Sequence, residues 1–320
     1  MTNEEIEKLD FKIALQNTIQ AAMQDELVRI EHRFFRQANT SGEGLVLILK
    51  DDKVAPVIHV DDMYEIYKSG VSVDDIVNNF MNSYKNMRKD IPELSRENLE
   101  KSLYTVVINK HMNESLLKTV PYRIVANNLA EVARFRVSSN EKGQTSFQIT
   151  NQHCRYLHML PDEILDIAHK NTENQQYILE NLSKITAAMF NDEELKDIYD
   201  EDYAVDDIML LSNTTGIDGA NVITSQKIMK EVSEQLDCNY YALPSSRHEL
   251  IIVPENFDVD ERYLIQMVRE VNKTLDKKDF LSDDIYYYNA QKMTLSQIGD
   301  KQLQEKAITA LLDRKPTMKH

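Results

Sequence analysis

The sequence contains few glycines, and this excludes several common nucleotide-binding motifs. Only seven occur in 320 residues, at positions 42, 44, 70, 143, 216, 219 and 299. A dinucleotide-binding GxGxxG turn, a P-loop and a GxSxG nucleophile elbow all need glycines or small residues at fixed short spacings. None of these spacings is present. The sequence therefore predicts neither dinucleotide binding of that type nor P-loop phosphate chemistry.

Cysteines and long apolar runs are also scarce. The two cysteines, Cys154 and Cys238, belong to no recognisable motif, which is typical of a reducing compartment. The N-terminus lacks the basic region and apolar core of a signal peptide. No apolar run approaches the ~20 residues that span a bilayer. We therefore expect a cytoplasmic protein without membrane contact.

Basic residues are outnumbered by acidic ones. The chain has 37 Lys and Arg against 53 Asp and Glu, a formal net charge of −16. Phosphate backbones bind proteins mainly through Lys and Arg, so no nucleic-acid partner is expected. A weaker alternative remains, in which the acidic surface imitates a nucleic acid.

Metal-ligating residues occur in one region without a metal-binding pattern. His153, Cys154, His158 and His169 lie close in sequence, and Cys154 and His158 share a helical face. A zinc site needs about four ligands in defined geometry, and finger or HExxH spacing is missing. We predict no metal and no cofactor.

Residues 207–289 alternate apolar strands with amphipathic helices. Strands are expected at 208–212, 240–243, 249–253 and 285–288, and helices from Thr224 and over 259–275. This βαββαβ order predicts a split βαβ, or ferredoxin-like, sheet. Its strands are apolar without alternation, so both sheet faces should be buried. We expect the N-terminal region to cover the second face, through helices in 151–190, with a second subunit as the alternative.

The rest of the chain predicts an α+β fold with several helices and short hairpins. The expected units are an N-terminal α+β region at 1–190, an acidic linker at 191–206, the split βαβ domain at 207–293 and a C-terminal helix and tail at 294–320. The N-terminal region should contain strands at 27–35, 45–49 and 54–60, a hairpin formed by 131–137 and 146–150, and helices at 4–24, 61–68, from 72, 96–109, 151–159, 161–171 and 175–190.

One polar cluster falls between two predicted strands. It comprises Ser245, Ser246, Arg247, His248 and Glu249, and a split βαβ topology brings the strand-end Asn213 to the same sheet edge. These six residues are the candidate binding site.

The cluster also contains the residue types of a nucleophile, a base and an orienting acid, which favours a hydrolase or transferase as an alternative. On a strand, however, His248 and Glu249 point to opposite faces. A hairpin corner is therefore the preferred interpretation.

Several runs in the sequence resemble an uncharacterised family. These are LSNTTGIDGANVI, YYALPSSRHELIIVP, MVREVN and LSDDIYYYN, with APVIHVDDMYEIYKSGVSVDDIV and INKHMNESLLKTVPYR upstream. Together they resemble a bacterial "domain of unknown function" family of gut clostridia. The run HCRYLHML departs from the Trp-Gly-containing stretch expected there. The resemblance implies no activity, cofactor or catalytic residue.

The sequence therefore predicts a non-catalytic cytoplasmic binding or regulatory protein. Its partner would be a protein or a small molecule, and an oligomer is possible.

Overall fold

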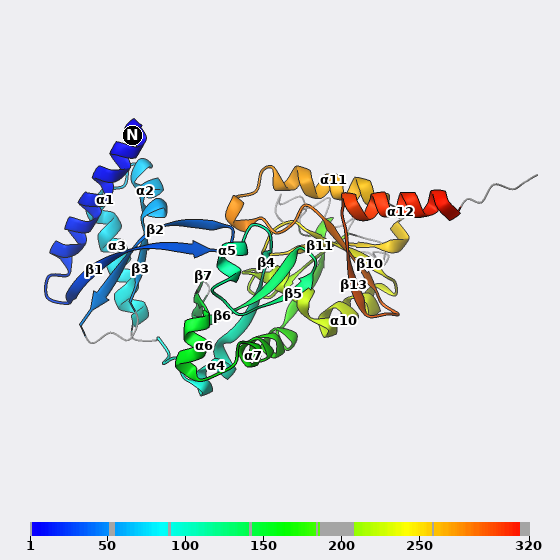
Figure 1. Cartoon of the computed structure of the whole chain (residues 1–320), viewed down its shortest axis with the longest axis horizontal. Coiled ribbons are helices and arrows are strands. Elements are labelled where there is room, and N and C mark those ends of the chain that lie inside the picture. The colour runs from blue at the N-terminus through cyan, green and yellow to red at the C-terminus, as the bar shows by residue number, and fades with distance from the viewer. Residues whose placement is uncertain are drawn as a thin grey trace, which may run out of the picture.

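The computed structural model describes residues 2–50, 55–88, 91–140, 143–183, 185, 208–257 and 259–313. The predicted acidic linker lies outside these residues. The described part of the chain is a mixed α+β fold with three sheets (Figure 1). This confirms the predicted fold class. No helix in the described ranges is both long and apolar enough to cross a bilayer.

The first sheet and its helices form the N-terminal unit, residues 2–50 and 55–88. Its elements are α1 (Asn3–Ala22), β1 (Leu27–Gln37), β2 (Thr40–Leu49), β3 (Val57–His59), α2 (Val60–Lys68) and α3 (Val73–Arg88). As predicted, β2 and β3 pair, with Leu45 opposite Ile58. Phe11, Leu15 and Ile19 of α1 pack with β2 in the core of the N-terminal unit. The β1–β2 hairpin extends from this unit toward the rest of the molecule (Figure 1).

The second sheet has the order β4-β6-β5, and β7 pairs with β6. Its elements are α4 (Arg96–Ser102), β4 (Leu103–Asn109), α5 (Glu114–Leu117), β5 (Tyr122–Ala126), β6 (Leu129–Asn140), β7 (Gly143–Gln148), α6 (Asn151–Leu157) and α7 (Pro161–Glu173). The predicted β6–β7 hairpin is confirmed. The predicted helix at 96–109 is wrong in its second half, which is β4. Every residue of β4 is buried, and its β-branched Thr-Val-Val-Ile run favours a strand.

The third sheet has the order β13-β12-β10-β11-β9-β8, with every neighbouring pair antiparallel. Its elements are β8 (Tyr177–Asn181), β9 (Met209–Asn213), η1 (Gly219–Thr224), α10 (Gln226–Leu236), β10 (Tyr240–Pro244), β11 (Leu250–Pro254), η2 (Glu255–Phe257), α11 (Glu261–Asn272), η3 (Lys277–Asp279), β12 (Ile285–Asn289), β13 (Thr294–Ile298) and α12 (Asp300–Asp313). The sheet thus extends beyond 207–293 at both ends. The domain boundaries themselves stay a prediction.

The βαββαβ order of β9 to β12 is observed, but the ferredoxin-like detail is not confirmed. A ferredoxin-like sheet places the first strand of the unit between the third and the last. Here β9 lies between β11 and β8, because β8 pairs with it along its whole length. The predicted helix at 175–190 is wrong where β8 forms. This strand takes the edge that the last strand would need, and β12 pairs with β10 instead.

The two helices of the unit cover opposite faces of the sheet. The crossovers β9–α10–β10 and β11–α11–β12 step across the sheet in the same direction but start from antiparallel strands. Because such crossovers are right-handed, α10 and α11 fall on opposite sides. Accordingly, α10 packs with Tyr240 and Ile252 in one core, and α11 packs with Leu243 and Val253 in another.

Both faces are buried, as predicted. The face under α10 is completed by Val107, Ala126 and Leu129 of the second sheet. The N-terminal region therefore adds its strands to the face that α10 already covers, and α7 contacts η1 and α10 there. The other face is covered by α11, so the expectation that the N-terminal region covers it through helices in 151–190 is wrong. Those helices pack on the same face of the second sheet, where β6 contributes Ala133 and Phe135.

A pH-dependent contribution to stability is expected at Glu131, which is 1% exposed in β6. Its carboxylate lies 3.2 Å from Arg123 and 3.2 Å from His169 Nδ1. The hydrogen bond with Glu131 raises the pKa of His169. With the folded-state pKa raised, the contribution is complete below the unfolded value of about 6.5 and is lost as the pH rises through the folded value.

Urea denaturation of the wild type and His169→Gln should show this dependence. The loss of unfolding free energy caused by the substitution should be about 1 kcal/mol larger at pH 5.5 than at pH 8.5. A loss that grows with pH would contradict the assignment.

Candidate functional site

The predicted site residues meet at one edge of the third sheet. Leu211 of β9 lies opposite Leu250 of β11, so Asn213, two residues on, is level with the hairpin at 245–249. The Ser212 hydroxyl donates to the His248 carbonyl oxygen at 2.7 Å. The hairpin and the end of β9 therefore form one continuous corner.

Most polar side chains of this corner bind local groups. Asn213 Oδ1 accepts from the backbone N–H of Thr215 at 3.1 Å, and its Nδ2 donates to the Ile217 carbonyl at 2.9 Å. Ser246 Oγ accepts from the His248 backbone N–H at 2.9 Å. Ser245 Oγ donates to Glu249 Oε1 at 3.2 Å. These bonds shape two turns.

His248 is held on both ring nitrogens. Its Nδ1 accepts from the backbone N–H of Asp218 at 3.2 Å, so the proton of the neutral ring is on Nε2. Nε2 faces Asp279 Oδ1 at 3.2 Å. Within this described corner, neither serine hydroxyl bonds the ring. The contacts thus orient the hairpin and do not assemble a nucleophile with its base.

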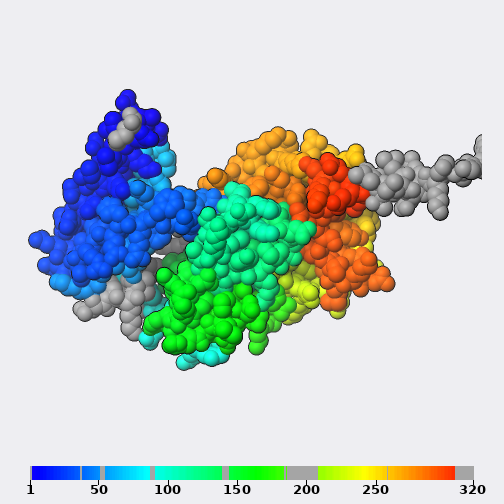
Figure 2. Space-filling model, viewed as in Figure 1, coloured from blue at the N-terminus to red at the C-terminus, as the bar shows by residue number. Residues whose placement is uncertain are grey.

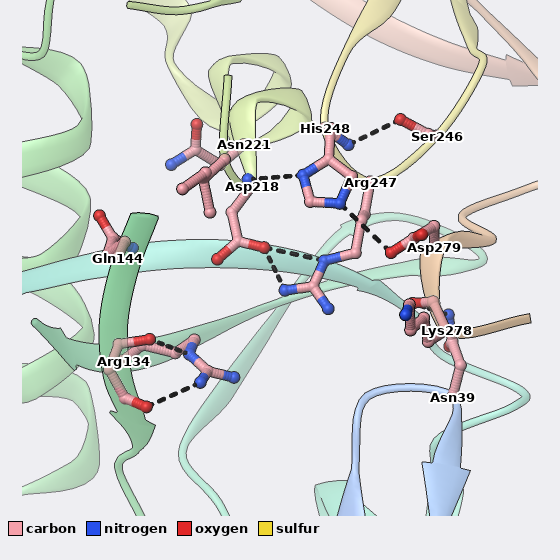
Figure 3. A network of polar contacts seen from close by, with 12 residues as sticks. Asn39, Arg134, Gln144, Asp218, Asn221, Ser246, Arg247, His248, Lys278 and Asp279 are labelled. Atoms are coloured by element: carbon pink, nitrogen blue, oxygen red, sulfur yellow. Dashed lines mark hydrogen bonds and ion pairs between the residues drawn. The ribbon is translucent and has the colours of Figure 1, made fainter. Parts of the chain in front are cut away.

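Asp218 is the centre of this region (Figure 3). Its side chain is 3% exposed, and both Nε, at 2.8 Å, and Nη2 of Arg247 donate to its Oδ1. Asp218 immediately precedes η1 and has a left-handed φ of 55°. The next residue must be glycine, because a Cβ on Gly219 would lie 2.4 Å from the His248 carbonyl oxygen. The turn therefore packs directly on the hairpin.

The other oxygen of Asp218 connects the corner to the second sheet. The Tyr104 hydroxyl of β4 lies 3.3 Å from Asp218 Oδ2 and 3.0 Å from Ser146 Oγ of β7. Gln144 Nε2 donates to the same hydroxyl at 2.7 Å. Burial, and then the Asp218 carboxylate, raise the pKa of Tyr104. Tyr104 therefore stays neutral and can donate to Asp218.

Two arginines of β6 border this network without an acidic partner in the described structure. Arg134 donates from Nε to Ser146 Oγ at 3.0 Å and from Nη2 to the Ser146 carbonyl at 3.1 Å. Arg136 donates from Nε to Gln144 Oε1 at 2.8 Å, and its guanidinium lies 4.8 Å from the centre of the Tyr104 ring. Both charges are held in place by neutral groups.

Arg134 and Ser146 also line a cavity of about 1080 Å³. Figure 2 shows the hollow where the N-terminal unit, in blue, meets the teal and green second part. The apolar part of the lining includes Phe35 and Tyr84 from the N-terminal unit and Phe147 from β7.

The described lining residues of this cavity include Arg36, His59 and Arg134 but no Asp or Glu. Acidic residues are 53 of 320 in the chain, so 24 lining residues drawn at random would hold about four. The described part of the lining thus carries positive charge and no carboxylate.

Sequence reasoning missed Asp218, Asp279, Tyr104 and the two arginines. The Ile-Asp-Gly turn after Gly216 marks Asp218 as a turn residue but not as the partner of Arg247. The alternation of Arg134 and Arg136 with Ala133, Phe135 and Val137 is a signal for a strand with one polar face. It could have drawn attention to β6.

The region with histidines and a cysteine has local structural contacts. His153 Nδ1 accepts from the backbone N–H of Thr150 at the start of α6, and burial lowers its pKa. Cys154 is buried, and His158 ends the helix. Within the described ranges, no group of three or more His, Cys, Asp or Glu is arranged to hold a metal ion.

The Asp218–Arg247 pair should dominate the stability of the corner. Asp218→Ala leaves a buried guanidinium unpaired and should cost about 3–5 kcal/mol of unfolding free energy. Adding Arg247→Met should restore part of the loss, because an apolar side chain needs no counter-charge. The exposed pair of Lys230 and Glu234, 3.0 Å apart, provides the control. Glu234→Ala should cost below about 1 kcal/mol, and an equally small effect of Asp218→Ala in chemical denaturation would refute the assignment.

Comparisons with known proteins give a family and no activity. A family profile described as "Family of unknown function (DUF5688)" matches residues 8–290. No curated protein and no solved structure matches the chain. The match covers both the N-terminal unit and the corner at 245–249, and it confirms the resemblance to an uncharacterised family. The chain belongs to the DUF5688 family of unknown function.

Proposed function

We propose that this chain is a cytoplasmic, non-catalytic binding protein whose cavity holds a small organic anion with an apolar body. The observation that carries the proposal is Arg134. Its guanidinium faces a cavity whose described lining has no carboxylate, and its hydrogen bonds go only to the neutral Ser146. Half-buried cations without a counter-charge are costly, and an anionic ligand would remove that cost.

The net charge of the chain favours anion binding at Arg134 over anion binding elsewhere on the surface. A net charge of −16 repels anions from most of the surface. A cavity with low-dielectric walls concentrates the field of the few cations inside it. Arg134 is also oriented by Ser146, so a bound anion needs little further ordering of the side chain.

The apolar part of the lining indicates the other half of the ligand. Phe147 stacks on Phe135, with ring centres 5.1 Å apart, and Tyr84 stacks on Phe80 at 6.4 Å. Phe147, Tyr84 and Phe80 are thus held in place and present apolar surface to the cavity. Ligand sites of this kind combine an apolar lining with a few placed polar groups.

The candidate residues at the sheet edge do not line the cavity but support Arg134 from behind. Arg247 and His248 hold Asp218, and Asp218 holds Tyr104 beside Ser146 and Arg134. In this proposal Asn213, Ser245, Ser246 and Glu249 shape the corner and do not touch the ligand. The same contacts weaken the hydrolase alternative, because His248 has both ring nitrogens occupied.

The fluorescent dye 1-anilinonaphthalene-8-sulfonate tests the proposal, since it is itself an aromatic anion. We expect saturable binding to the wild type, and binding at least about tenfold weaker to Arg134→Gln, because a charge-assisted hydrogen bond contributes about 1.5–3 kcal/mol. Arg269→Gln is the matched control, because Arg269 pairs with Asp300 at 3.0 Å on the surface of α11. Equal binding to all three proteins, or no binding, would rule out this site.

A further inference from the structure

We propose that the anionic group taken by this cavity is a dianion, and specifically the phosphate of a phosphate monoester carried on an apolar body. This inference rests on the proposed function and specifies its ligand. It follows from the number of uncompensated charges beside the cavity and from the way they are held.

Two guanidinium groups beside the cavity, those of Arg134 and Arg136, bond only neutral groups among the described residues. Arg134, Arg136 and Arg247 contribute three guanidinium groups to the connected network, and Asp218 contributes one carboxylate. Asp279 bonds His248 and is drawn on the other side of Arg247 from Arg134 (Figure 3). A monoanion would leave one of the two charges unbalanced, whereas a dianion would balance both.

Asp218 is occupied by other partners. Its Oδ1 takes Arg247, and its Oδ2 lies within hydrogen-bond reach of Tyr104. It is 2% exposed, so it cannot swing toward the β6 arginines without breaking a buried pair. The charges of Arg134 and Arg136 are therefore available to a ligand.

The two arginines are placed for one compact anion. They are alternate residues of β6, so both lie on one face with Cα atoms about 6.6 Å apart. Tyr104 lies opposite Arg134 in the sheet, and its ring supports the guanidinium of Arg136. Gln144 holds both Arg136 and Tyr104. Fixed planar guanidinium groups suit the several oxygens of a phosphate better than the single charge of a sulfonate.

A phosphate monoester carries its second charge only above a known pH. Its second pKa is about 6, whereas an aryl sulfonate stays a monoanion throughout the neutral range. If only the dianion binds well, the apparent affinity should rise about tenfold between pH 5 and pH 7.5. A sulfonate of the same shape should not follow this rise.

Titration of the protein itself acts on both ligands in the same direction. Among the described residues, the charged or titratable groups that line the cavity are Arg36, His59 and Arg134. The groups bonded or packed next to this lining are Arg136, Tyr104, Asp218, Arg247 and His153. Protonation of His153 at low pH would strengthen the binding of any anion. This trend is opposite to the one expected for the phosphate.

The experiment compares 1-naphthyl phosphate with 1-naphthalenesulfonate as competitors of the bound dye in the full chain. We expect the phosphate-to-sulfonate affinity ratio to rise about tenfold from pH 5 to pH 7.5. The rise should disappear in Arg136→Gln and persist in Arg136→Lys, which keeps the charge. Arg269→Gln should behave as the wild type, and thermal melts of each variant verify that it is folded.

The outcomes separate this inference from the proposed function. If both compounds displace the dye with a ratio independent of pH, the cavity binds organic anions but the dianion inference is wrong. The dianion inference is also wrong if Arg136→Gln keeps the rise. If neither compound displaces the dye at any pH, the proposed function fails as well.

Discussion

The buried ion pair of Asp218 and Arg247 is the interaction on which the arrangement of the sheets depends. Removing two charges from water costs several kcal/mol for each ion unless they pair closely, so the hairpin at 245–249 and the turn before η1 cannot separate without that cost. The second oxygen of the carboxylate faces Tyr104 and links the third sheet to the second. A further consequence is chemical. Because this carboxylate is already paired with Arg247, it does not neutralise the arginines of β6 at the edge of the cavity.

A second junction places the N-terminal unit, which forms the opposite wall. At the tip of the β1–β2 hairpin, the Asn39 backbone N–H donates to Asn113 Oδ1 at 2.7 Å, and Asn113 Nδ2 returns a bond to Asn39 Oδ1 at 2.7 Å. Asn39 Nδ2 also donates to the Phe280 carbonyl next to η3. One buried residue with a left-handed φ of 62° thus contacts both other parts of the chain. A ligand between the two walls would add to these contacts.

The sequence predicted the elements that depend on local residue patterns. It did not predict the elements and the cavity whose structure depends on contacts with distant parts of the chain. The α+β class, the N-terminal helices and the corner at Asn213 and 245–249 followed from periodicity and turn residues. The strand β8 was missed because Ile178, Leu179, Leu182 and Ile185 also fit a helical stripe, and only the free edge of β9 makes the segment a strand. The cavity was missed for a similar reason. Alternation on β6 gives Arg134 a polar face, but the Phe35 wall opposite it comes from a hairpin about 100 residues earlier.

The central claim is that an anion with an apolar body occupies the cavity against Arg134. A crystal structure of the full chain with 1-naphthyl phosphate tests it most directly. The account predicts the phosphate within hydrogen-bond distance of Arg134 and Arg136, and the naphthyl ring among Phe35, Tyr84 and Phe147. Density for the compound on the outer surface alone, with the cavity unoccupied at saturating ligand, would contradict it.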